Sequence, residues 1–106
     1  MIHEILLRTS DNYVELVDLT DPLTNTVITT ALVQVTLKDK TGANVSGVSW
    51  PLTMNHVWAE SGTYRAVLPL ELSVTLDGVY TAEVFVSAGP NQRRTFRTPL
   101  VVRDSV

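Results

Sequence analysis

Polar and apolar residues alternate along several short stretches of the chain. The clearest stretch covers residues 31–38, where Val33, Val35 and Leu37 are apolar. The residues between and after them, Gln34, Thr36 and Lys38, are polar. A period of two is the spacing of side chains on one face of a β-strand. The pattern therefore predicts a strand here, and similar alternation predicts strands over residues 63–68 and 79–86.

Turn-forming residues bound other apolar runs, which we also predict to be strands. These runs cover residues 2–9, 13–19, 45–50 and 93–103, and the turns cover residues 10–12, 21–25, 39–42 and 88–92. Proline cannot donate to a sheet, so we expect a strand end or edge at Pro51 and an edge or bulge at Pro99. Residues 52–58 are ambiguous, and residues 69–76 fit a helical turn, an irregular crossover or a strand.

Two Gly-x-Tyr units stand at the start of predicted strands, with their tyrosines at Tyr64 and Tyr80. A glycine frees the turn, and a tyrosine two residues later can bury its ring while its hydroxyl finds a partner. The second unit resembles the tyrosine corner of immunoglobulin-type sandwiches. We therefore predict one all-β domain over residues 1–106, an immunoglobulin-like antiparallel β-sandwich of about seven to eight strands. Both tyrosines should be largely buried.

Composition narrows the classes of function. The 106 residues contain no cysteine, which excludes disulfides, thiolate metal sites and a cysteine nucleophile. The net charge of −3 gives no general attraction to nucleic acid or an anionic membrane. The apolar runs are far shorter than the ~20 residues of a membrane span. The first residues lack the features of a secretory signal, so we expect synthesis in the cytoplasm.

Candidate residues for catalysis or metal binding are few. His3 and His56 are the only histidines, and a metal site built from them with Glu4 or Glu60 has no recognisable ligand spacing. The acidic loop around Asp21 is best interpreted as solvated rather than as a calcium site. No nucleophile elbow or phosphate-binding glycine loop is present. We therefore predict a protein that is not an enzyme and has no catalytic residues, no cofactor and no metal.

Charge is distributed unevenly along the chain. Residues 1–30 hold five acidic residues and one arginine, whereas residues 88–106 hold four arginines and one aspartate. Arginine pairs well with carboxylates, so the basic end is a candidate interface. The simpler alternative is a solvated sheet edge whose arginines oppose aggregation. Another alternative is that residues 2–7 cover the apolar part of this surface. The candidate interface residues are Phe85, Arg93, Arg97, Val101 and Arg103.

The order of turn and core residues resembles a known group of proteins. The shared positions are Asp21-Pro22-x-Thr24, Ala31-x-Val33-x-Val35-Thr36-Leu37-x-Asp39, Gly42, Val45-x-Gly47, Trp50-Pro51, Met54, Ser61-Gly62-Thr63-Tyr64-Arg65-Ala66 and Gly78-x-Tyr80. At these positions the chain is similar to the small immunoglobulin-like proteins encoded among the virion structural genes of tailed bacteriophages. Its strand and turn content is also similar to immunoglobulin-like modules of bacterial surfaces.

The phage resemblance implies a structural protein of the capsid, neck or tail that acts through protein–protein contacts. It implies a virion location after synthesis in the host cytoplasm, with other virion proteins and copies of itself as partners. It carries no catalytic or binding residue to this chain. The alternative function is a cell-surface or carbohydrate-binding adhesion module, which needs exposed aromatic residues. Trp50 and Trp58 are the candidates, and Trp50, next to Pro51, fits the core better.

Overall fold

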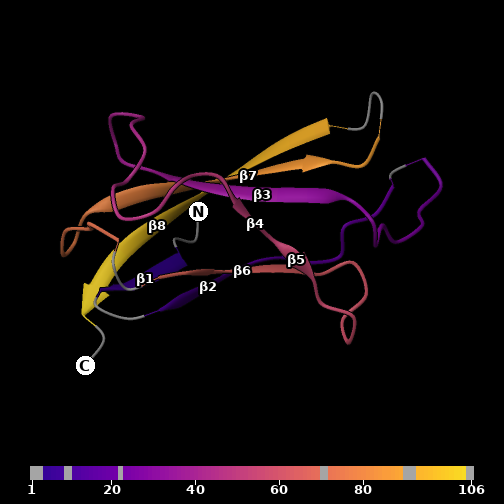
Figure 1. Cartoon of the computed structure of the whole chain (residues 1–106), viewed down its shortest axis with the longest axis horizontal. Helices are drawn as coiled ribbons and strands as arrows, with labels where there is room; N and C mark the ends of the chain where they lie inside the picture. The colour runs from indigo at the N-terminus through magenta and orange to yellow at the C-terminus, as the bar shows by residue number, and fades with distance from the viewer. Residues whose placement is uncertain (1–3, 9–10, 22, 70–71, 90–92, 105–106) are drawn as a thin grey trace.

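The computed structural model describes residues 4–8, 11–21, 23–69, 72–89 and 93–104, which form two β-sheets and no helix (Figure 1). The large sheet has the strand order β1-β8-β7-β3-β4 and the small sheet the order β2-β6-β5. The strands are β1 (Glu4–Arg8), β2 (Asn12–Leu16), β3 (Leu32–Lys38), β4 (Leu52–Thr53), β5 (Asn55–His56), β6 (Tyr64–Leu68), β7 (Val79–Ser87) and β8 (Arg93–Asp104). The prediction of an all-β sandwich is confirmed.

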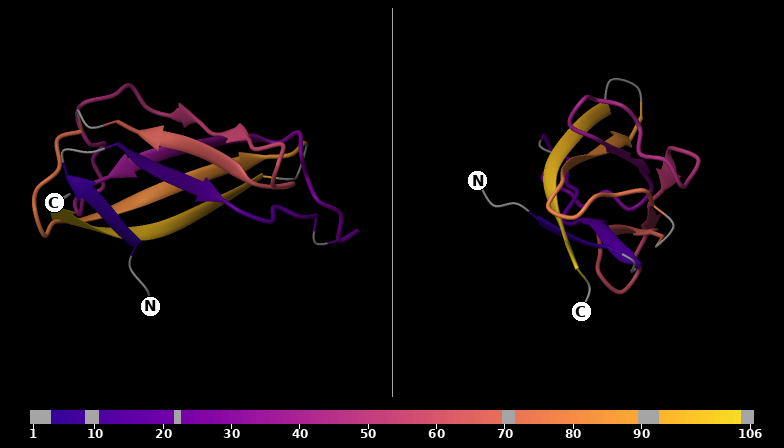
Figure 2. Two further views of the ribbon diagram at one scale, coloured as in Figure 1. Left: turned by 90° about the horizontal axis from the view of Figure 1, so that it is seen from below. Right: turned by 90° about the vertical axis from the view of Figure 1, so that its left-hand side faces the viewer.

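The core lies between the two sheets, which Figure 2 shows as facing layers. On β3 the side chains of Val33, Val35 and Leu37 are fully buried, as their alternation predicts. The antiparallel register places them opposite buried residues of β7, beginning with Val86 opposite Val33. Directly opposed residues project to the same face of a sheet, so this register fixes which side of β3, β7 and β8 faces the core.

Both predicted tyrosines are buried and hold loops, so this expectation is confirmed. Tyr64 is 1% exposed, and its hydroxyl donates to the carbonyl of Ile28 (2.9 Å) and accepts from the amide of Ala31 (3.2 Å). Tyr80 is 8% exposed, and its hydroxyl accepts from the amide of Thr75 (2.9 Å). Each ring thus fills core volume while its hydroxyl fixes the backbone of a crossing loop.

Strand β1 differs from the antiparallel arrangement that we expect from the sequence. It pairs in parallel with the second half of β8, from Glu4 opposite Leu100 to Arg8 opposite Asp104. It therefore widens the large sheet at its edge and does not lie across Phe85. Proline lacks an amide proton, and pairing between β1 and β8 begins only after Pro99.

The segment that follows β3 also departs from prediction. The turn over residues 39–42 is present, with Gly42 at φ 87° and an isolated bridge joining Lys38 to Asn44. The Thr41 hydroxyl donates to the Asp39 carboxylate and holds its pKa below the ordinary value. However, the expected strand over residues 45–50 does not form. Gly47 turns the chain at φ 118°, and the chain beyond it is irregular.

The structure assigns the described parts of the two ambiguous segments. Residues 52–58 contain two very short strands in different sheets, β4 and β5, and the buried Met54 lies between them. This segment therefore joins the sheets at one side of the sandwich. In the second segment, described residues 72–76 form an irregular crossover. Leu72 from this crossover is buried in the core, which explains its apolar character.

Candidate functional site

All five predicted interface residues lie on one face of the large sheet. We define this outer face as the side of β3, β7 and β8 that points away from the small sheet. Phe85 on β7 lies opposite Thr95 on β8, and Arg97 opposite Glu83. Val101 lies opposite Val79, and the odd-numbered residues of β8 share this side. The register therefore places the five residues on one face, as the sequence predicts.

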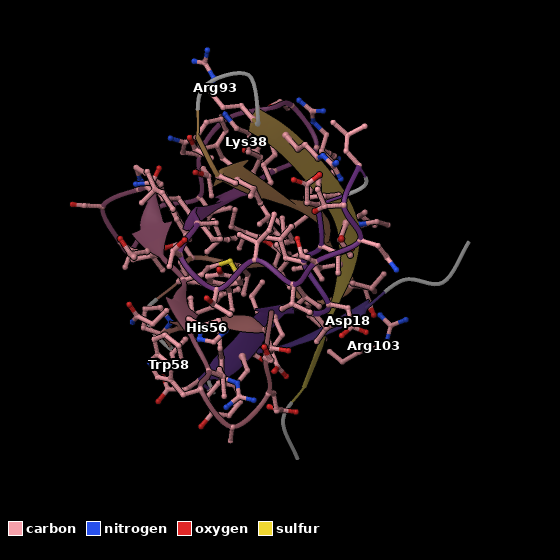
Figure 3. The ribbon with its side chains drawn as sticks, turned by 90° about the vertical axis from the view of Figure 1, so that its right-hand side faces the viewer. Asp18, Lys38, His56, Trp58, Arg93 and Arg103 are labelled. Carbon is pink, nitrogen blue, oxygen red and sulfur yellow. The ribbon has the colours of Figure 1, made fainter. Side chains whose placement is uncertain are left out.

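Two of the three arginines on this face already have partners within the chain. Arg97 Nε lies 3.0 Å from Glu83 Oε2, and Arg103 Nη1 lies 2.6 Å from Asp77 Oδ1. Arg93 stands at the β7–β8 hairpin end, where Figure 3 shows its side chain reaching outward. Among the described residues, none forms an ion pair with Arg93. Arg93 is therefore the arginine of this face whose charge is available to another molecule.

The apolar residues of the outer face form two separate groups. Phe85, 37% exposed, and the exposed Leu32 lie near Arg93, whereas Val79 and Val101 lie near Arg103. Val101 lies six residue steps along β8 from the position opposite Phe85, about 20 Å at the usual rise per residue. The Glu83–Arg97 ion pair crosses the space between them. The five predicted residues therefore share a face without making one cluster.

A second candidate site lies on the small sheet, around His56 and Arg65. Both residues line a hollow of about 350 Å³, together with Asn55 and Val67. His56 Nε2 accepts a hydrogen bond from the amide of Gly62 (3.0 Å). His56 Nδ1 and Arg65 Nε are buried and have no hydrogen-bond partner within the described part of the chain. Because both nitrogens are enclosed within the fold, neither is exposed to the hollow itself.

Exposed aromatic rings flank this hollow. Trp58 is 77% exposed, and its ring centroid lies 4.3 Å from that of His56 (Figure 3). Tyr13 is 73% exposed, and the Arg65 guanidinium lies over it, 5.5 Å from the ring centroid. A hydrogen bond to Glu15 raises the pKa of Arg65, which keeps the guanidinium charged.

The sequence identifies only part of this second site. Trp58 is among its candidates, and Trp50 packs against the core, donating from Nε1 to the carbonyl of Val45 (2.6 Å). Tyr13 and Arg65 are missed, because their proximity depends on pairing between β2 and β6. His3, the other histidine of the imagined metal site, lies outside the described residues. Glu60 contacts Arg65 instead, and the described residues contain no group of three or more potential metal ligands.

Comparisons with known proteins identify no relative of this chain. No protein family matches the chain, no curated protein matches its sequence and no solved structure matches it. Within the described ranges, no helix is both long and apolar enough to cross a lipid bilayer.

Proposed function

We propose that this protein is a non-enzymatic structural component of a tailed-bacteriophage virion that acts through protein–protein contacts of its outer face. The supporting observation is the pairing of half-exposed Phe85 and Leu32 with the uncompensated charge of Arg93 at one end of that face. An apolar anchor edged by arginine is the usual composition of a protein interface. The phage assignment itself rests on the sequence resemblance.

The apolar residues carry most of the proposed affinity. Exposed ion pairs contribute only ~0–1 kcal/mol each, so the arginines mainly set orientation and the rate of association. On binding, Arg97 and Arg103 would exchange one carboxylate partner for another, and this exchange adds little to the affinity. Phe85 and Leu32 instead lose contact with water when a partner covers them. The proposed partners are other proteins of the capsid, neck or tail, and copies of this chain.

A double variant of the outer face tests this function. Phe85→Ser with Arg93→Glu removes the anchor and reverses the free charge, and we expect at least a tenfold loss of copies per purified virion, or about 1.4 kcal/mol. Arg97 and Arg103 are left intact, since a glutamate there would face Glu83 or Asp77. Val67→Ser with Lys40→Glu is the matched control, because Val67 is exposed on the small sheet and Lys40 is exposed in the turn that follows β3. Equal incorporation of both variants, with equal melting temperatures, would refute the proposal.

The second candidate function is glycan binding at the hollow beside His56. Exposed Trp58 and Tyr13 offer flat apolar rings, and exposed Asn55 and half-buried Arg65, which line the hollow, carry N–H donors suited to sugar hydroxyl oxygens. If this function holds, a glycan array should show a defined specificity that Trp58→Ala abolishes and Trp58→Phe partly retains. Equal glycan binding by the Trp58→Ala and Trp58→Phe variants would exclude this site.

A further inference from the structure

Among the described residues, the first half of β8 pairs with a strand on one side only. Residues 93–101 pair with β7, whereas β1 pairs with β8 only from Leu100 onward. In Figure 1 the first half of β8 forms the upper border of the sheet at the right, with β7 below it. Within the described part of the chain, no strand pairs with the other side of residues 93–98. We call this stretch the free edge.

The backbone hydrogen-bond pattern shows which groups point outward from the free edge. The amide of Val102 donates to the carbonyl of Gly78, and the carbonyl of Val102 accepts from the amide of Asp77. The backbone N–H and C=O of Val102 therefore point toward β7. Along an antiparallel strand, successive residues direct these groups alternately to one side and to the other. It follows that Arg93, Thr95 and Arg97 direct their amides and carbonyls away from β7. Pro99 has the same parity, so the hydrogen-bond ladder with β7 loses nothing from its missing amide proton.

The side chains beside the free edge are basic and apolar. Residues 93–98 include three arginines and no acidic residue. Arg93 and Arg97 lie on the outer face, and Arg94 lies on the opposite face beside Phe96. Phe96 points to the core side, as its register opposite buried Val84 requires, yet it is 36% exposed. A strand added here would cover Phe96 and meet positive charge on both faces.

We propose that the free edge binds an extended acidic segment of a partner protein, which joins the large sheet as an additional strand. Unpaired backbone groups supply the hydrogen bonds of such strand addition, and alternating side chains give it specificity. Charge complementarity selects the partner: carboxylates meet the arginines, and an apolar residue covers Phe96. This inference rests on the proposed function, because it defines the chemistry of the partner at the same end of the sheet.

Amide hydrogen exchange followed by NMR tests the inference residue by residue. In the free protein we expect slow exchange at Arg94, Phe96 and Thr98 and fast exchange at Arg93, Thr95 and Arg97. The probe is a blocked octapeptide of alternating glutamate and valine. When it occupies about nine-tenths of the protein, exchange at Thr95 and Arg97 should slow about tenfold. An alternating lysine–valine peptide, or the glutamate peptide with an N-methyl group on every amide, should not slow it.

The variant Thr95→Pro provides a second measurement. It removes one outward donor at a position with the parity of Pro99, and it should weaken peptide binding at least tenfold while β7 amides stay protected. Unchanged exchange at Thr95 and Arg97 under saturating peptide overturns the inference. If peptide signals shift only around Phe85 and Val101, the inference fails while outer-face binding stands. Concentration-dependent dimerisation that protects the same amides would instead assign the edge to a second copy, and would also overturn it.

Discussion

Replacing Tyr64 with alanine should lower the free energy of unfolding by about 3–5 kcal/mol, the usual cost of deleting a large aromatic side chain from a core. The ring is 1% exposed, so its loss leaves a cavity between the sheets. The hydroxyl also joins the carbonyl of Ile28 to the amide of Ala31, and both would lose a partner. Urea unfolding followed by tryptophan fluorescence measures the change.

Two further substitutions separate the contributions of Tyr64. Tyr64→Phe keeps the ring and should cost only about 1–2 kcal/mol, for the two hydrogen bonds. Tyr13→Ala is the exposed control, because the Tyr13 side chain lies on the solvent side of β2. This substitution should lower the free energy of unfolding by less than about 1 kcal/mol. If Tyr64→Ala were no more destabilising than Tyr13→Ala, Tyr64 would not anchor the core.

Replacing Tyr80 with alanine should cost a similar amount, about 3–5 kcal/mol. Its ring is buried against the large sheet, and its hydroxyl holds the amide of Thr75 in the crossover that precedes β7. Tyr80→Phe removes only this hydrogen bond and should cost about 1 kcal/mol. A melting temperature of Tyr80→Ala equal to that of the parent protein would contradict this role of the tyrosine.

Local patterns predict the centre of the fold well. Alternation at Val33, Val35 and Leu37 predicts the buried face of β3, since burial on one side is what selects such a pattern. The Gly-x-Tyr units predict the buried tyrosines for the same reason. Parity along β8 also places Arg93, Arg97, Val101 and Arg103 on one side. These features depend only on residues close in sequence.

Features that depend on distant pairing are not predictable in this way. The residues of β1 read equally well as a strand of either sheet, and only the structure shows its parallel pairing with β8. The division of the outer face by Glu83 and Arg97 requires the register between β7 and β8. Similarly, Glu15 and Arg65 meet only because β2 pairs with β6. The second candidate site is therefore incomplete in the sequence.

Photo-crosslinking within assembled virions tests the central claim most directly. A photoreactive phenylalanine analogue replaces Phe85 in one variant and Val67, on the small sheet, in the other. After irradiation, mass spectrometry of purified particles should identify crosslinks from position 85 to another virion protein or a second copy, with few from position 67. Absence of the protein from the particles, or equal crosslinking from both positions, would contradict an assembly role for the outer face.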